Sequence, residues 1–353
     1  MHKLLIINKA QFGYHTDYYK YCQYLRDDFD ITYFCFDAGL KRLEMPGVNV
    51  QYISSKGFRL LRGTRFILWA LFTVFGFKGI VFIHYFKNCQ LLKHLLPWKK
   101  MILDIRSLSI NKNEKIRIEY DNRLKKEIRY FDFVTIISEG LRKKIDLDLN
   151  KSAILPLGAD IISRKDKKFN ENVKLLYAGT LNGRNIHQTI IGLYFFLKEN
   201  PSYKNIVYDI IGDGKELSDL KKLVSEYKLE NIVKIHGRIP HFEINPFFDK
   251  CNIGISYVPM TDYYEHQPVT KTYEYILSGM PCIATKTYEN RQLITSENGV
   301  LCDDDPKSFA LGLEQIIANL DTYKSEKIRS TLIDNTWENI SKTTFTPILS
   351  RFV

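Results

Sequence analysis

Short runs of β-branched and aromatic residues recur along the whole chain, separated by stretches with helical periodicity. Strands separated by helices favour parallel sheets joined by βαβ crossovers, so we expect two open α/β domains. The length of 353 residues agrees with two domains, at about 150 residues each. The expected strands are Leu4–Ile7, Ile31–Phe36, Ile80–His84, Met101–Asp104, Phe133–Ile137, Ala153–Leu155, Lys174–Tyr177, Val207–Ile211, Val233–His236, Ile253–Tyr257 and Pro281–Ala284.

A polar, charged stretch between Asp160 and Asn172 separates the two sets of strands. We therefore expect one open α/β domain over residues 1–163 and a second over 164–335. Residues 1–163 hold 27 basic and 16 acidic side chains, and residues 164–353 hold 24 of each. The whole positive excess thus belongs to the first domain.

One segment of that domain, Met45–Leu103, contains nine Lys or Arg and no Asp or Glu. Within it, Phe66–Phe77 is an uncharged apolar run of twelve residues, too short for the roughly 20 residues of a spanning helix. We interpret the stretch up to Phe86 as helix, turn and strand. The helix is either buried beneath a solvated basic rim or part of a patch over residues 56–100 that contacts an anionic membrane surface. We favour the patch because apolar and basic features coincide.

The six cysteines are scattered without a CxxC or Cys/His cluster, which predicts neither a disulfide framework nor a zinc site. The apolar stretch Leu4–Ile7 is too short for a signal-peptide core. We expect a cytoplasmic protein.

Two motifs in the second half indicate an anion site. Gly212-Asp213-Gly214 follows an expected strand and precedes a helical pattern. It is either a turn whose backbone can approach a phosphate or a plain βα turn. Lys271 and Glu274 lie one turn apart on an expected helix, where the lysine could hold a diphosphate and the glutamate two ribose hydroxyls. The alternative is an exposed Lys–Glu pair, worth about 0.2–0.5 kcal/mol.

The segment PVTKTYEYILSGMPCIAT resembles the donor-binding helix of the GT-B glycosyltransferases, specifically family four, the glycosyl transferases group 1. Other stretches follow in the family's order: PLGAD (Pro156–Asp160), LLYAGTLNGRNI, IIGDGKEL, HGRIP (His236–Pro240) and ENGVLCDDDP. The resemblance implies two doubly wound Rossmann-like domains facing a cleft. It also implies a C-terminal helix over residues 336–353 that crosses back to the first domain.

The resemblance assigns donor contacts residue by residue. Glu274 matches the glutamate that binds the ribose, and Lys271 the lysine that touches the diphosphate. Arg184 stands one position short of the usual place of the basic residue in the phosphate loop. The remaining expected donor-binding residues are Gly13 in the N-terminal loop, Gly212, Arg238 in the loop that receives the base, and Thr272.

The main departure from the family concerns the first glutamate of its Glu-x7-Glu signature. His266 occupies that position, and the nearest carboxylate, Glu265, is one residue away. Either a loop adjustment brings Glu265 to the donor sugar or the role is altered, which we favour. Both residues are candidate catalytic groups.

Further candidates lie at expected strand ends in the first half, where open α/β sheets bind ligands. Arg106, in a DIRSLS stretch that resembles one branch of the family, either acts on the leaving diphosphate or the acceptor or forms an ion pair with a carboxylate such as Glu119. His84 and Asp104 are expected on the acceptor side, although a structural role for His84 is slightly favoured.

The resemblance implies a retaining glycosyltransferase that moves a hexose from a nucleotide sugar to a glycan or polyprenyl-linked saccharide in cell-surface polysaccharide assembly. We expect it at the inner face of the cell membrane. No DxD motif follows a strand, and Asp305-Pro306 is typical of a helix start, so we expect neither metal nor cofactor. The alternatives are a nucleotide-sugar 2-epimerase of GT-B fold and a basic nucleic-acid-binding protein. The Lys271–Glu274 motif argues against a nucleic-acid partner.

Overall fold

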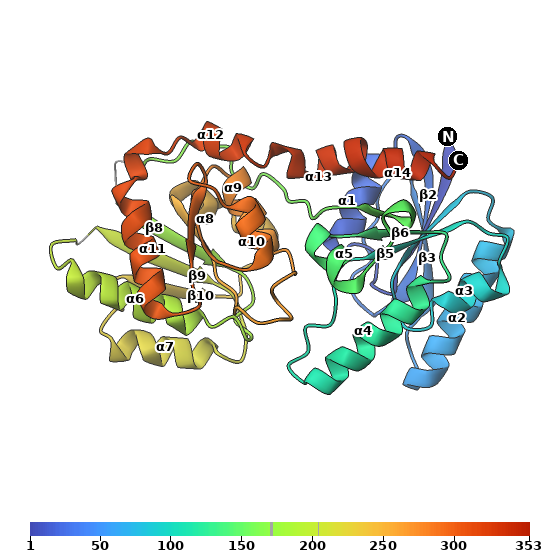
Figure 1. Ribbon diagram of the computed structural model, residues 1–353, viewed down its shortest axis with the longest axis horizontal. Helices are drawn as coiled ribbons and strands as arrows, with labels where there is room; N and C mark the ends of the chain where they lie inside the picture. The colour runs from blue at the N-terminus through green and yellow to red at the C-terminus, as the bar shows by residue number, and fades with distance from the viewer. Residues whose placement is uncertain (170–171, 204) are drawn as a thin grey trace. The chain divides into compact units, whose positions relative to one another are not determined.

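The computed structural model describes residues 1–169, 172–203 and 205–353. The chain forms two compact units, one of Met1–Gly158 with Trp337–Val353 and one of Ala159–Thr336. Figure 1 shows a parallel sheet with covering helices in each. The charged stretch expected to separate the domains, Asp160–Asn172, includes Asn170 and Glu171, which lie outside the described residues.

The first unit has a seven-stranded parallel sheet in the order β3-β2-β1-β4-β5-β6-β7. Its central strands are buried on both faces, as their continuous apolar sequences require. The strands are β1 His2–Ile7, β2 Phe29–Asp37, β3 Val48–Ser54, β4 Ile80–His84, β5 Met101–Ile105, β6 Phe133–Ile136 and β7 Ser152–Ile154. The helices are α1 Thr16–Leu25, α2 Arg59–Gly76, α3 Gln90–Leu95, α4 Glu114–Ile128 and α5 Glu139–Ile145, with a 3-10 turn at Leu149–Lys151.

The second unit has a six-stranded parallel sheet in the order β10-β9-β8-β11-β12-β13. The strands are β8 Val173–Ala178, β9 Ile206–Ile211, β10 Val233–Gly237, β11 Ile253–Ser256, β12 Cys282–Thr285 and β13 Gly299–Cys302. The helices are α6 Ile186–Glu199, α7 Leu217–Glu226, α8 Asn245–Lys250, α9 Thr270–Leu277, α10 Tyr288–Leu293, α11 Pro306–Ala318 and α12 Ser325–Ser330. Short 3-10 turns lie at His241–Glu243, Leu320–Thr322 and Ile333–Asn335.

Both sheets have the doubly wound order, so the expected fold class is confirmed. In the first unit β1 lies between β2 and β4, and in the second β8 lies between β9 and β11. At such a switch point the loops leaving the two strands diverge, and the crevice beyond the strand ends is the usual ligand site. The loops after β1, β4, β8 and β11 are therefore where functional side chains should gather.

The last segment of the chain returns to the first unit, as the fold resemblance implied. It consists of α13 Trp337–Asn339, a π-helical turn Ile340–Phe345 and α14 Thr346–Ser350. The Phe345 ring lies 4.7 Å from Tyr21 and 4.6 Å from Phe82, measured between ring centres. Gly158 leaves room for Trp337, since a methyl group there would come within 2.5 Å of the indole. Aromatic packing thus holds the C-terminal helix on α1 and β4.

Candidate functional site

Lys271 lies in the first turn of α9 and is the most unusual charged residue of the second unit. It is 8% exposed, and its Nζ atom has no hydrogen-bond partner among the described residues. Burial and the nearby Arg184 lower the pKa of Lys271 well below its usual range, while Glu274 opposes the shift. A buried cation without a partner is costly, so this position is suited to a group that receives an anion.

The loop after β8 supplies the space and a second cation. A methyl group at Gly179 would come within 3.1 Å of Lys271 Nζ, so the bare glycine keeps the approach to the ammonium open. Farther along this loop, the Arg184 guanidinium lies 4.7 Å from the centre of the Tyr264 ring, and its Nε atom is buried without a partner within the described chain. Two under-satisfied cations beside a glycine backbone form a site for a phosphate-like anion.

The Gly212-Asp213-Gly214 motif supports this loop from behind. A methyl group at Gly212 would lie 2.0 Å from the Gly179 carbonyl oxygen, and one at Gly214 would lie 2.8 Å from the Asn182 nitrogen. The Leu181 N–H also donates to the Asp213 carbonyl at 3.0 Å. Both glycines are therefore required by close backbone contact. Gly212, expected to contact the donor, packs against the loop that carries Gly179.

Glu274 lies one helical turn after Lys271, with 16% of its side chain exposed. Its Oε1 atom is 3.4 Å from His241 Nε2, a long contact that leaves capacity to accept further hydrogen bonds. A carboxylate so placed can accept bonds from vicinal hydroxyl groups. Arg238 directly follows β10, at the carboxyl end of the sheet where the loop after β8 also lies, and it is exposed.

Thr272 and Tyr275 fix α9 in place. The Thr272 hydroxyl is buried and lies 2.6 Å from Ser256 Oγ and 3.2 Å from Asn290 Oδ1, so it is committed to the protein interior. The Ala178 N–H donates to Tyr275 Oη at 2.8 Å, and Gly254 makes room for the Tyr275 ring. Sequence reasoning missed Tyr275, although its place directly after Glu274 was a signal. These contacts hold the Lys271 ammonium 4.0 Å from the centre of the Tyr177 ring.

The two alternatives for the first glutamate lie in the loop between β11 and α9. Glu265 Oε1 is 2.5 Å from Arg291 of α10, so this carboxylate is engaged in an ion pair. The His266 ring packs on Tyr288 with 4.8 Å between ring centres. The Arg184 guanidinium packs on the ring of Tyr264 in the same loop, and this contact joins the loop to the one after β8.

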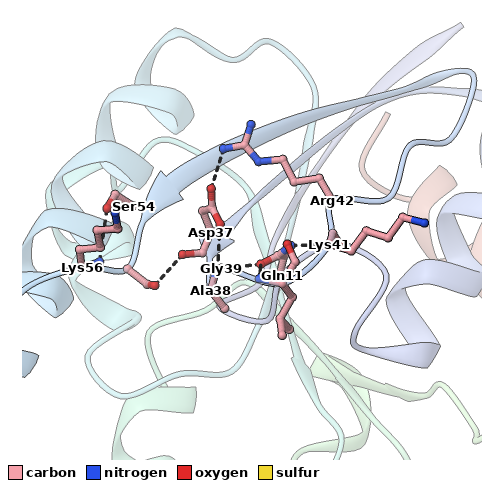
Figure 2. A network of polar contacts seen from close by, with 10 residues as sticks. Gln11, Asp37, Ala38, Gly39, Lys41, Arg42, Ser54 and Lys56 are labelled. Atoms are coloured by element: carbon pink, nitrogen blue, oxygen red, sulfur yellow. Dashed lines mark hydrogen bonds and ion pairs between the residues drawn. The ribbon is translucent and has the colours of Figure 1, made fainter.

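In the first unit, the loop after β1 is held by a residue that sequence reasoning missed. Gln11 Nε2 donates to the Leu40 carbonyl at 2.8 Å. The Ala38 N–H donates to Gln11 Oε1 at 2.8 Å (Figure 2). Gly13 has φ +89°, and a methyl group there would lie 2.4 Å from Leu43 Cδ1. Gly13 is thus needed both for its backbone conformation and for the close approach of the segment after β2.

Arg106 is buried, with 6% of its surface exposed, and is held on several sides. Its Nε donates to Asp17 Oδ2 of α1 at 2.6 Å, and Nη1 donates to the Leu155 carbonyl at 2.6 Å. The structural ion pair therefore exists, but with Asp17 rather than Glu119, which pairs with Arg123. The guanidinium links α1 to the loops after β5 and β7 and is itself committed to protein groups.

Asp104 and His84 lie beside this ion pair. Asp104 is fully buried and accepts hydrogen bonds from Tyr18 at 2.5 Å and Thr135 at 2.6 Å, so the structure gives it an internal role rather than contact with an acceptor. The half-buried His84 ring lies 4.9 Å from that of His15. Burial, His15 and Arg106 lower the pKa of His84 to about 3, so its imidazole is neutral at physiological pH.

Throughout the described ranges, no group of three or more His, Cys, Asp or Glu side chains is placed to hold a metal ion. The six cysteines are buried free thiols. The candidate site of the second unit consists of Lys271, Arg184 and Glu274 around the glycine loop after β8.

Residues 159–332 match the family described as Glycosyl transferases group 1. Among solved structures, the chain is similar to sucrose-phosphate synthase from Thermosynechococcus elongatus, at 15% identity over 99% of each chain with a TM-score of 0.76. It is also similar to a glycosyltransferase from Rickettsia africae, at 14% identity over 99% of this chain and 98% of that one with a TM-score of 0.73.

A third similar structure is Anabaena HepE in complex with UDP and glucose, at 12% identity over 99% of this chain and 100% of that one with a TM-score of 0.73. At these identities the likenesses establish the two-unit GT-B fold. No curated protein gives a significant match to the sequence.

Proposed function

We propose, from the premise that residues 159–332 form a domain of the glycosyl transferases group 1 family, that this protein is a retaining hexosyltransferase. It moves a hexose from a nucleoside diphosphate sugar to a glycan or polyprenyl-linked saccharide in cell-surface polysaccharide assembly. It works in the cytoplasm, at the inner face of the cell membrane. The observation that carries the proposal is the buried ammonium of Lys271, which has no hydrogen-bond partner in the described part of the chain and lies against the open backbone of Gly179.

The chemistry of the donor accounts for this arrangement. Breaking a sugar–diphosphate bond places negative charge on the leaving phosphate and positive charge on the sugar ring. Preorganised cations aimed at the phosphate stabilise that transition state without reorganisation. Lys271 and Arg184 supply such cations, and we infer that they act without a metal ion.

The remaining side chains bind and orient the donor. Glu274 accepts hydrogen bonds from the two ribose hydroxyls, and Arg238 lies where the base is received. The loop of Glu265 and His266 faces the sugar. Because Glu265 is paired with Arg291, His266 is the better candidate for the position of the first glutamate.

The experiment is a donor panel of UDP, GDP, ADP and TDP sugars, with release of nucleoside diphosphate measured with and without a glycan acceptor. UDP-glucose is the first donor to test because HepE holds UDP and glucose. We expect activity with one nucleotide class, retained in EDTA and with the anomeric configuration preserved by NMR. Lys271→Met should lower it strongly, whereas Lys222→Met, at a side chain 81% exposed on α7, should not.

Two results would contradict the proposal. One is the absence of nucleotide binding by calorimetry across the panel. The other is a sugar epimerised at C2 in place of a transferred one, which would indicate an epimerase of the same fold.

A further inference from the structure

Helix α2 buries one face in the ordinary way. Phe66, Ala70 and Val74, at four-residue spacing, are fully buried. The Phe66 ring packs against Phe36 at 4.5 Å and Phe86 at 5.4 Å between ring centres. A helix that packs through one stripe normally carries polar residues on its opposite face, where it meets water.

The opposite face of α2 is apolar instead. Four large apolar side chains share one stripe there because they are spaced by seven, four and three residues. They are Leu61, Leu68, Phe72 and Phe75, with exposed fractions of 64%, 54%, 72% and 63%. Trp69 borders the stripe with 53% exposure. We call these five residues the outer face of α2. In the described structure this face is open to solvent, so it exposes far more apolar surface than a solvated helix should.

A neighbouring segment extends the apolar surface. Helix α3 lies beside α2 in the first unit (Figure 1). Lys99 Nζ donates to the Phe77 carbonyl at 2.6 Å, which ties the loop after α3 to the C-terminal end of α2. Trp98 of that loop is 63% exposed and Leu95 of α3 is 58% exposed. Exposed Trp98 thus lies in a loop tied to the C-terminal end of α2, and tryptophan is favoured at membrane–water interfaces.

The charged side chains of the chain segment that forms this surface are of one sign. Residues 45–103 contain no carboxylate side chain. The lysines at 78, 87 and 100 are exposed and make no ion pair with any described residue. Lys93 is the exception, since its Nζ lies 2.8 Å from Asp132. An apolar helix face on a segment whose charged side chains are all basic complements a surface that is apolar inside and anionic outside.

We propose that the outer face of α2, together with Trp98, docks into the interface of an anionic lipid bilayer with its axis along the membrane plane. A second copy of the chain fits this surface less well, because a two-fold interface would set the basic side chains of this segment against their own copies. The bilayer supplies both the apolar layer and the anionic headgroups. None of the described helices is long and apolar enough to cross a bilayer.

This inference deepens the proposed function, because docking brings the enzyme to a lipid-linked acceptor. Only that step rests on the proposed function. The docking itself depends on residues of the first unit alone. Donor chemistry, by contrast, depends on the second unit, so the two can fail separately.

The test is co-sedimentation of the full chain with phosphatidylcholine vesicles and with vesicles of equal parts phosphatidylcholine and phosphatidylglycerol, at low and high salt. We expect binding to the anionic vesicles that weakens with salt, because it draws on screened charges. The double change Phe72→Ser and Phe75→Ser should weaken vesicle binding at least about tenfold, since two large apolar side chains no longer leave water. Leu311→Ser, at an equally exposed leucine (63%) of α11, is the matched control.

Charge is tested separately. Changing the lysines at 78, 87 and 100 to Glu should weaken binding to anionic vesicles by more than about tenfold. The same change at Lys221, Lys307 and Lys324 of the second unit, all exposed, should have little effect. Thermal melts check that each variant is folded.

Two outcomes overturn the proposal. The first is vesicle binding that ignores lipid charge, salt and both sets of changes. The second is a dimer, measured by light scattering, that the double serine variant converts to a monomer while wild type binds no vesicles. Nucleotide binding measured without vesicles should be the same in wild type and in the serine variant. If wild type binds no nucleotide, that result counts against the proposed function and leaves the docking proposal untouched.

Discussion

The ammonium of Lys271 lies 4.0 Å from the centre of the Tyr177 ring and has no hydrogen-bond acceptor within the described residues. A cation over an aromatic ring gains about 0.5–2 kcal/mol, whereas removing an ammonium from water costs several kcal/mol. The ring and the charge of Glu274 do not offset that cost, since the pKa of Lys271 stays well below its usual range. The second unit thus keeps a destabilising cation in place, which is expected where an anionic ligand binds.

Replacing Lys271 by Met should separate stability from binding. The variant removes the desolvated amino group and keeps most of the side-chain volume, so we expect the second unit to gain about 1–3 kcal/mol of stability. Nucleotide binding should weaken by about 1.5–3 kcal/mol, the range for a hydrogen bond to a charged group. Hydrogen exchange of the β8 and α9 amides measures the first effect and calorimetry the second. A variant that loses both stability and binding would show that Lys271 has a structural partner.

Nucleotide binding should also be linked to pH through the same residue. The pKa of Lys271 is lowered in the free protein by burial, and a bound diphosphate favours the charged form and raises it again. Binding therefore takes up a proton between the free-state and bound-state pKa values, and affinity falls as pH rises across that window. Calorimetry in buffers of different ionisation enthalpy measures the uptake. Lys271→Met should abolish the part of the proton uptake that is due to Lys271. The part due to titration of the nucleotide phosphate should remain.

Glu274→Gln should weaken binding of a nucleoside diphosphate by about 1.5–3 kcal/mol, because the ribose hydroxyls lose a charged acceptor. Its weak contact with His241, at 3.4 Å, leaves that capacity available in the wild-type protein. A 2′,3′-dideoxy nucleotide cannot make these bonds and should bind wild type and variant alike. Equal affinity of the two proteins for the normal nucleotide would remove Glu274 from the site.

Gly212→Ala tests the support of the phosphate loop. The added methyl group would lie 2.0 Å from the Gly179 carbonyl oxygen, so the loop must shift relative to Lys271. We expect at least a tenfold loss of nucleotide affinity, about 1.4 kcal/mol. Gly63→Ala, in α2 with no atom within 4 Å of the added group, should be neutral or stabilise the helix by about 0.5–1 kcal/mol. Unchanged affinity in Gly212→Ala would mean that the two loops are not coupled.

Much of the fold could be predicted because buried parallel strands read as short apolar runs. All eleven expected segments overlap observed strands. The two strands that were not expected lack that signal. β3, Val48–Ser54, is an edge strand of the first sheet that alternates apolar and polar residues, and β13, Gly299–Cys302, is four residues long and begins with glycine.

Site residues could be predicted where the residue type itself determines what the side chain can bind. They could not be predicted where the role of a side chain depends on its hydrogen-bond and ion-pair partners. Lys271 and Glu274 stood out by their spacing, and the structure gives Lys271 the burial that an exposed pair would lack. Arg106 and Asp104 were singled out by their position at strand ends, but their partners, Asp17 and Tyr18, lie about 90 residues away in sequence. Such long-range contacts leave no local pattern.

The buried ion pair of Arg106 with Asp17 yields the last prediction. Asp17→Asn keeps the shape but leaves the guanidinium without its nearest counter-charge, which should cost the first unit about 3–5 kcal/mol. The double change Asp17→Leu and Arg106→Met removes both charges and should cost less than the single change, because no uncompensated ion stays buried. Glu119→Gln, in an ion pair whose carboxylate is 71% exposed, should cost less than about 0.5 kcal/mol. All three tryptophans lie in the first unit, so urea unfolding followed by tryptophan fluorescence reports on this unit. If Asp17→Asn were as mild as Glu119→Gln, Arg106 would be free to move, and its expected action on the leaving diphosphate or the acceptor would regain support.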